Sequence, residues 1–143
     1  MLSKKIGHKQ DLALVIMRMA AGVVFAAHGI QKLEGGVGNF ASFLNQLAVP
    51  FPEFFAWVVA LTETIGGILL IIGALSRVAA ALLSVVMIVA IIKVKSYIGL
   101  IAPPGGGAGA ELDLSLLAIV IAIVLLGPGS YSVEKGFFGR ELS

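Results

Sequence analysis

The chain of 143 residues contains no cysteine and only two histidines. Without cysteine it cannot form a disulfide, hold an iron–sulfur cluster or build a thiolate zinc site. One of the two histidines, His8, lies in the polar N-terminal tail, so a single chain cannot offer two buried imidazole ligands to haem. Haem binding would need a symmetric dimer or a methionine ligand. We therefore expect no metal site and no covalent cofactor. Any redox chemistry would have to use a bound group.

Charge is also scarce. Ten Lys and Arg against eight Asp and Glu leave a net charge of +2, too small for the basic surface of a nucleic-acid-binding protein. Charged residues make up 13% of the chain, whereas an ordinary soluble domain has about 25%. Hydrophobic residues make up 59%, with a mean hydropathy of +1.05. This composition excludes a soluble globular domain and predicts an integral membrane protein whose main partner is the lipid bilayer.

Long apolar stretches predict a single all-α domain, a bundle of four transmembrane helices. A hydrocarbon core of about 30 Å requires roughly 20 helical residues. The stretches that meet this requirement are 12–30, 54–75, 78–98 and 108–127. The last is bounded by a Gly-rich linker before it and by Gly127-Pro128-Gly129 after it. A cleaved signal peptide is an alternative for the first stretch, but Arg18 in its middle argues against cleavage.

The loop charges predict that both termini face the cytoplasm. Six Lys or Arg residues flank the helix ends on the side of the termini, and three, Lys32, Lys93 and Lys95, flank the other ends. In the first outer loop, Asn39 could cap a short interfacial helix that carries Phe40 and Leu44 on one face. An irregular loop packed by its aromatic residues is the alternative.

Two charged residues lie within the predicted spans, where an unpaired charge is costly. Arg18 lies about 9 Å from one end of the first helix, and Glu63 lies about 14 Å from the opposite end of the second. On adjacent antiparallel helices their depths differ by about 7 Å, so we expect an ion pair. This pair could serve function, or it could only fix the helix register.

Further polar residues are expected to gather at the outer ends of the helices. A polar funnel would result, with Arg18 and Glu63 as its floor. Its rim would comprise His28, Gln31, Lys32, Lys95, Glu111 and Asp113. Such a vestibule could admit a polar headgroup, a quinone ring, an anion or protons, or it could be a structural charge network.

Several segments resemble the DoxX family. RMAAGVVFAAHGIQKL (18–33) is similar to its first-helix signature, and ETIGG (63–67) to part of its second helix. GPGSYSVEKGFFGR (127–140) is similar to its ending. The resemblance extends over roughly 11–140 and implies a four-helix bundle in the bacterial inner membrane. Two departures are Lys95, where the family commonly has His, and Glu134, where it commonly has Asp. The first alters any proton-transfer role at that position.

The resemblance also implies a function, because DoxX members are described as small membrane subunits of oxidoreductase systems. We expect a subunit of a quinone-linked or redox-defence assembly with redox-protein partners. In such a subunit His28 or Lys95 would donate to a quinone oxygen, and Glu63 would relay protons. The alternatives are a carrier of a small molecule or lipid and a membrane scaffold without catalysis. Each of these functions is compatible with a homo-oligomer.

Overall fold

A computed structural model describes residues 2–105 and 108–138 of the chain, and every regular element among them is helical. Four helices form the body: α1 (Leu2–Glu34), α3 (Pro52–Ile72), α4 (Ser76–Lys93) and α5 (Glu111–Leu126). Three short helices lie between or after them: α2 (Val37–Gln46), the 3-10 helix η1 (Lys95–Tyr97) and α6 (Val133–Phe138). The predicted spans therefore all correspond to helices. Their ends are displaced by up to five residues, except that α1 begins at Leu2, ten residues before the predicted start at Leu12.

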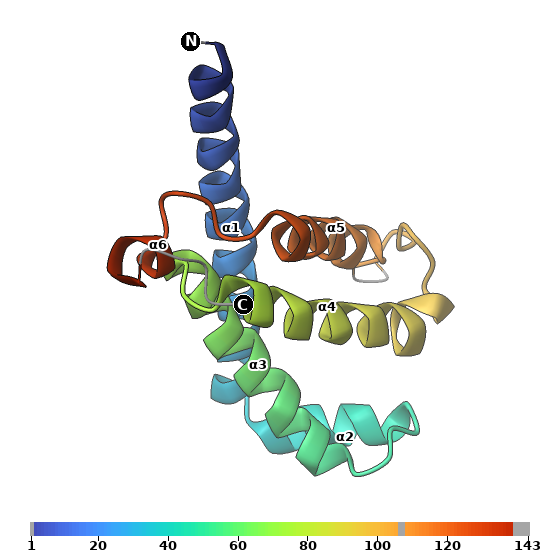
Figure 1. Ribbon diagram of the computed structural model, residues 1–143. Coiled ribbons are helices and arrows are strands. Elements are labelled where there is room, and N and C mark those ends of the chain that lie inside the picture. Colours follow the sequence, from blue (N-terminus) through green and yellow to red (C-terminus); the bar gives the residue numbers. More distant parts are fainter. Residues whose placement is uncertain (1, 106–107, 139–143) are drawn as a thin grey trace.

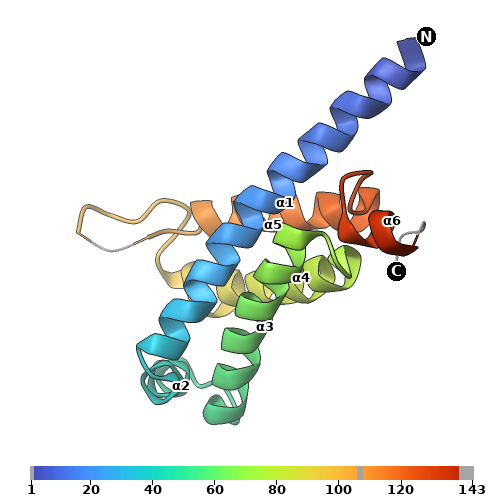
Figure 2. The same cartoon turned by 90° about the vertical axis from the view of Figure 1, so that its left-hand side faces the viewer.

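The long helices form two antiparallel pairs that cross at a large angle (Figure 1, Figure 2). Helices α1 and α3 make one pair, and α4 and α5 make the other. The N-terminal turns of α1 extend beyond all the other helices in both views. Helix α2 lies across the other end of the α1–α3 pair.

Glycines bring the backbones of α1 and α3 into close contact. A Cβ atom on Gly67 would lie 2.5 Å from the backbone nitrogen of Ala26 and 2.7 Å from the carbonyl oxygen of Gly22. A Cβ on Gly29 would lie 2.5 Å from the backbone nitrogen of Thr64. Neither position can hold a side chain without moving the backbone, so these glycines fix which residues of α1 and α3 lie side by side.

The main apolar core lies where the two helix pairs meet. Ala21 and Phe25 of α1, Leu83 of α4, and Val120 and Ile123 of α5 are each at most 1% exposed. A smaller cluster joins α2 to α3 and includes Val37, Ala41, Leu44 and Ala56. Many of the remaining large apolar side chains point outward, among them Ile16, Val85 and Leu125, each more than half exposed. An apolar exterior of this kind suits lipid rather than water.

Helix α2 exists as predicted, but its N-cap is not Asn39. The capping position is Gly36, with φ +88°, and Asn39 lies in the first turn of the helix. The side-chain nitrogen of Asn39 donates to the carbonyl oxygen of Gly35 at 2.7 Å, and within the described part of the chain no side-chain hydrogen bond caps the helix. A positive φ at the helix entry favours glycine, which explains why Gly36 takes this place.

Three helices are long and apolar enough to span a membrane, by length and composition within the described residues. These segments are Lys9–Glu34, Pro52–Ile72 and Ser76–Tyr97, the last including η1. Helix α5 has 16 residues, which corresponds to about 24 Å of helix. The all-helical membrane class is thus confirmed, whereas a fourth span and the orientation of the termini stay predictions.

Candidate functional site

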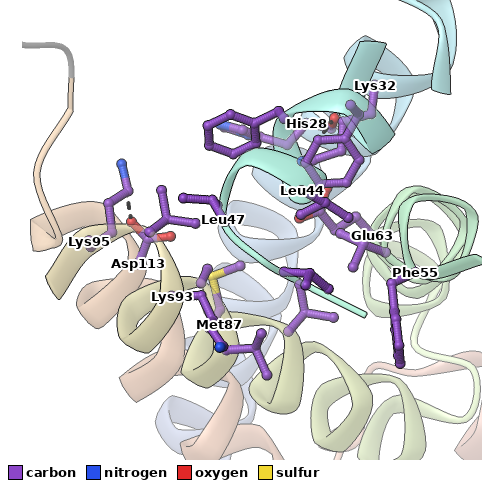
Figure 3. A pocket seen from close by; sticks show the side chains of 18 of the residues that line it. His28, Lys32, Leu44, Leu47, Phe55, Glu63, Met87, Lys93, Lys95 and Asp113 are labelled. Carbon is purple, nitrogen blue, oxygen red and sulfur yellow. Dashed lines mark hydrogen bonds and ion pairs between the residues drawn. The ribbon is translucent and has the colours of Figure 1, made fainter. Parts of the chain in front are cut away.

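A cavity of about 550 Å³ opens between α2 and the two helix pairs (Figure 3). Its walls are formed mainly by apolar side chains of α2, α3 and α4, including Phe40, Leu44, Phe55, Val59 and Val86. Polar side chains lie at two places along the lining, as Figure 3 shows, one on the side of α1 and α3 and one where α4 and α5 meet. The volume lies within the range of about 300–1,000 Å³ that is usual for small-molecule sites.

The first polar group is an ion pair between Lys32 of α1 and Glu63 of α3. The ammonium nitrogen of Lys32 lies 2.5 Å from Oε2 of Glu63 and 5.3 Å from the ring centre of Phe40. The side chain of Glu63 is 5% exposed and that of Lys32 is 21% exposed. A carboxylate this buried requires a partner, and Lys32 supplies the compensating charge while its own ammonium stays within reach of the cavity.

The predicted ion pair between Arg18 and Glu63 is therefore wrong. Arg18 and Lys32 are both on α1, and their separation of 14 positions corresponds to about 21 Å along the helix. Glu63 cannot contact both. The glycine contacts set a register that places Glu63 near the C-terminal end of α1, and α1 continues to Glu34, beyond the predicted end at Ile30.

Arg18 lies near the other end of α3 and is 2% exposed. Its Nη2 donates to the backbone carbonyl of Tyr131 at 2.6 Å, and Glu134 is the acid whose charge acts on it. Its guanidinium also packs closely against Gly73, at the end of α3.

The chain after α5 folds back against the middle of α1, beside this end of α3. Glu134, 1% exposed, accepts a hydrogen bond from the backbone N–H of Ser76 at 2.7 Å, and its own N–H donates to Gly73. The carboxylate lies at the N-terminus of α4, where a helix favours negative charge. These contacts tie the C-terminal segment to the turn between α3 and α4, so Arg18 belongs to a buried structural cluster and not to the cavity.

His28 lines the cavity one turn before Lys32 on α1. Its Nδ1 lies 2.8 Å from the carbonyl oxygen of Val24. A carbonyl oxygen can only accept, so Nδ1 carries the hydrogen and the neutral imidazole presents Nε2 as an acceptor. Among the described residues Nε2 has no hydrogen-bond partner.

The second polar group joins η1 to α5. Lys95 donates to the carbonyl oxygen of Ala108 at 2.7 Å and lies 3.9 Å from Oδ2 of Asp113 (Figure 3). Lys93, at the end of α4, also lines the cavity and is exposed. The sequence places Lys93 only among the residues that flank the outer helix ends. In the structure α4 ends at Lys93, and the chain then turns into η1 beside the cavity.

The structure thus brings together part of the predicted funnel. The members that line the cavity are His28, Lys32, Glu63, Lys95 and Asp113. Gln31, Glu111 and Arg18 do not line it. The apolar walls contributed by α2 were not foreseen, although the stripe of Phe40 and Leu44 in the sequence was the available signal. Among the described residues no cluster of His, Asp or Glu side chains could hold a metal ion.

The fold and the cavity define an integral membrane protein of the small helical type, with a largely apolar cavity between its helices. The chain belongs to the DoxX family, whose model matches residues 13–96.

Two relatives extend this match over most of the chain. It is 34% identical over 128 residues to the Bacillus subtilis (strain 168) protein named "Putative oxidoreductase CatD", covering 90% of this chain and 89% of the relative. It is 31% identical over 134 residues to the Mycobacterium tuberculosis (strain ATCC 25618 / H37Rv) protein named "Uncharacterized membrane protein Rv3486", covering 86% of this chain and 80% of the relative. No solved structure matches the chain significantly.

Proposed function

We propose that this chain is the integral membrane subunit of a quinone-linked or redox-defence oxidoreductase assembly, and that the cavity binds the quinone. The observation that carries the proposal is the combination of apolar walls with polar groups at the cavity lining. The name of the Bacillus subtilis relative, an oxidoreductase, agrees with it. In such an assembly redox-protein partners would deliver or remove the electrons.

The residues present fit a quinone headgroup. The ammonium of Lys32 is a hydrogen-bond donor at the lining, and Phe40 and Phe55 offer apolar ring surface. A bound quinone would supply two-electron redox chemistry. Glu63 would hold Lys32 in position through their ion pair, and its carboxylate could relay a proton.

We also propose a fourth membrane crossing by α5, with both termini in the bacterial cytoplasm. Helix α5 lies antiparallel to α4 along its length, and Glu111 and Asp113 occupy its first turn, where charge is tolerated at an interface. The bacterial origin of both relatives supports the inner membrane as the location. The asymmetry of loop charges supports the orientation.

A carrier of a lipid or small molecule is the second candidate. The predominance of aliphatic side chains in the cavity walls favours it, since such walls would also fit an acyl chain. Uptake of a labelled lipid by proteoliposomes containing the purified chain would separate a carrier from a quinone-binding subunit.

A thermal-shift titration with a short-chain quinone tests the proposed function. A ligand that binds only the folded state stabilises it by about 2.7 kcal/mol at a concentration of 100 Kd. We expect a concentration-dependent rise in Tm that Glu63→Gln weakens, because the Lys32 ammonium loses the carboxylate that positions it. Lys135→Ala, an exposed position outside the cavity lining, is the control. Absence of any shift up to the solubility limit of the quinone would contradict quinone binding.

A further inference from the structure

Two neighbouring groups of the cavity lining have opposite hydrogen-bonding character. His28 and Lys32 are four residues apart on α1 and therefore share one face of the helix. Because Nδ1 of His28 is committed to Val24, the neutral imidazole offers only the acceptor Nε2. The ammonium of Lys32 offers only donors.

A hydroxyl group matches this pair better than a carbonyl group does. A hydroxyl can donate to Nε2 of His28 and accept from Lys32, whereas a carbonyl oxygen can accept from Lys32 but leaves Nε2 unpaired. A ligand that displaces water from Nε2 without replacing the hydrogen bond loses affinity. Building on the proposed function, we propose that the cavity selects the hydroxylated form of its ligand, a hydroquinone or related phenol, over the corresponding quinone.

The ion pair with Glu63 strengthens this discrimination. It holds the Lys32 ammonium at the cavity side, and a weaker contact of 3.5 Å joins the ammonium to the carbonyl oxygen of His28. The donor and the acceptor are thus positioned on one rigid helix before the ligand arrives. Preorganisation of this kind converts a difference in hydrogen bonding into a difference in affinity.

The apolar walls define the remainder of the ligand. Phe40 lies beside the Lys32 ammonium, and Leu44, Phe55 and Val59 continue the wall away from it. A flat ring would fit with its hydroxyl toward α1 and an alkyl substituent along α2 and α3. The chemical class is therefore an amphiphilic ring with at least one free hydroxyl.

Binding of three matched ligands to the full-length purified protein tests this proposal. The ligands are a decyl-substituted hydroquinone, its quinone and its dimethyl ether, and the hydroquinone is kept reduced with excess dithionite under anaerobic conditions. We expect the hydroquinone to bind about tenfold more tightly than the other two, a ratio in the range that one unpaired polar group costs. His28→Phe, which keeps a ring but removes both nitrogens, should abolish the preference. Gln31→Ala, on the same helix but outside the cavity lining, should retain it.

The outcomes separate the two proposals. Equal or tighter binding of the quinone overturns the hydroxyl selection while leaving quinone binding intact. A preference that persists in His28→Phe overturns the assignment of that selection to His28. Failure of all three ligands to bind overturns both proposals. If His28→Phe does not fold, the comparison of the three ligands on the wild-type chain still decides the question.

Discussion

The buried charges of α1 and α3 provide the sharpest test of the packing. Three substitutions, Lys32→Met, Glu63→Gln and Arg18→Met, remove one charge each with little change of volume. We expect Arg18→Met to be the most destabilising, by about 3–5 kcal/mol, because it removes the charge facing buried Glu134. Lys32→Met should cost less, since Lys32 is partly exposed and its loss leaves Glu63 free to take up a proton.

Double-mutant cycles then identify which charges touch. The Lys32–Glu63 cycle should give a coupling energy of about 1–3 kcal/mol, as expected for groups in direct contact. The Arg18–Glu63 cycle should be additive within about 0.5 kcal/mol, because about 21 Å of helix separates Arg18 from Lys32. Unfolding would be followed by circular dichroism in mixed micelles with increasing denaturing detergent. A larger coupling for Arg18–Glu63 than for Lys32–Glu63 would refute the assigned register of α1 and α3.

Three further predictions concern packing and topology. Gly67→Ala should lower the free energy of unfolding by about 1–3 kcal/mol in the same assay, because the new Cβ would meet the backbone of α1. Gly66→Ala is the control: its Cβ would meet the side chain of Leu83, so the loss of stability should be smaller. Gly73→Ala should cost about 1–3 kcal/mol, since φ is +73° and the Arg18 guanidinium occupies the space; Gly136→Ala, with nothing within 4 Å, is its control. In intact cells an impermeant maleimide should label Ser42→Cys but not Lys135→Cys, and the reverse pattern would invert the proposed topology.

The secondary structure could be predicted because lipid solvent imposes a simple rule. Apolar runs of about 20 residues must be helical, since every backbone polar group needs a partner within its own segment. The runs at 54–75 and 78–98 correspond to α3 and to α4 with η1 for this reason. The C-terminal end of α1 is Glu34, four residues after the predicted end at Ile30. The polar residues Gln31 and Lys32 predict a membrane interface, whereas in the structure Lys32 pairs with buried Glu63 of α3.

The partners of the buried charges could not be predicted from depth alone. Depth along a helix is uncertain by a turn or more, and the contacts of Gly22, Gly29 and Gly67 decide the register at the level of single residues. The partner of Arg18 is a backbone carbonyl at Tyr131, 113 residues away, and a pattern of side chains carries no signal for such a contact. The cavity was only partly foreseen because α2, read as a surface helix, packs on α3 and supplies apolar walls.

Arg18 and Glu63, though both buried, therefore have separate roles, and this separation can be measured. Arg18 holds the C-terminal segment against the end of α3, while Glu63 holds Lys32 at the cavity. Arg18→Lys loses the planar guanidinium that reaches Tyr131 and should lower the Tm of the ligand-free protein. Because the cavity does not include Arg18, the rise in Tm produced by a saturating hydroquinone should be the same as in wild type. Glu63→Gln should instead reduce that rise, since the Lys32 ammonium loses the carboxylate that positions it. An equal loss of the ligand-induced shift in both variants would mean that the two ends of the α1–α3 pair are coupled, and that the C-terminal segment takes part in binding.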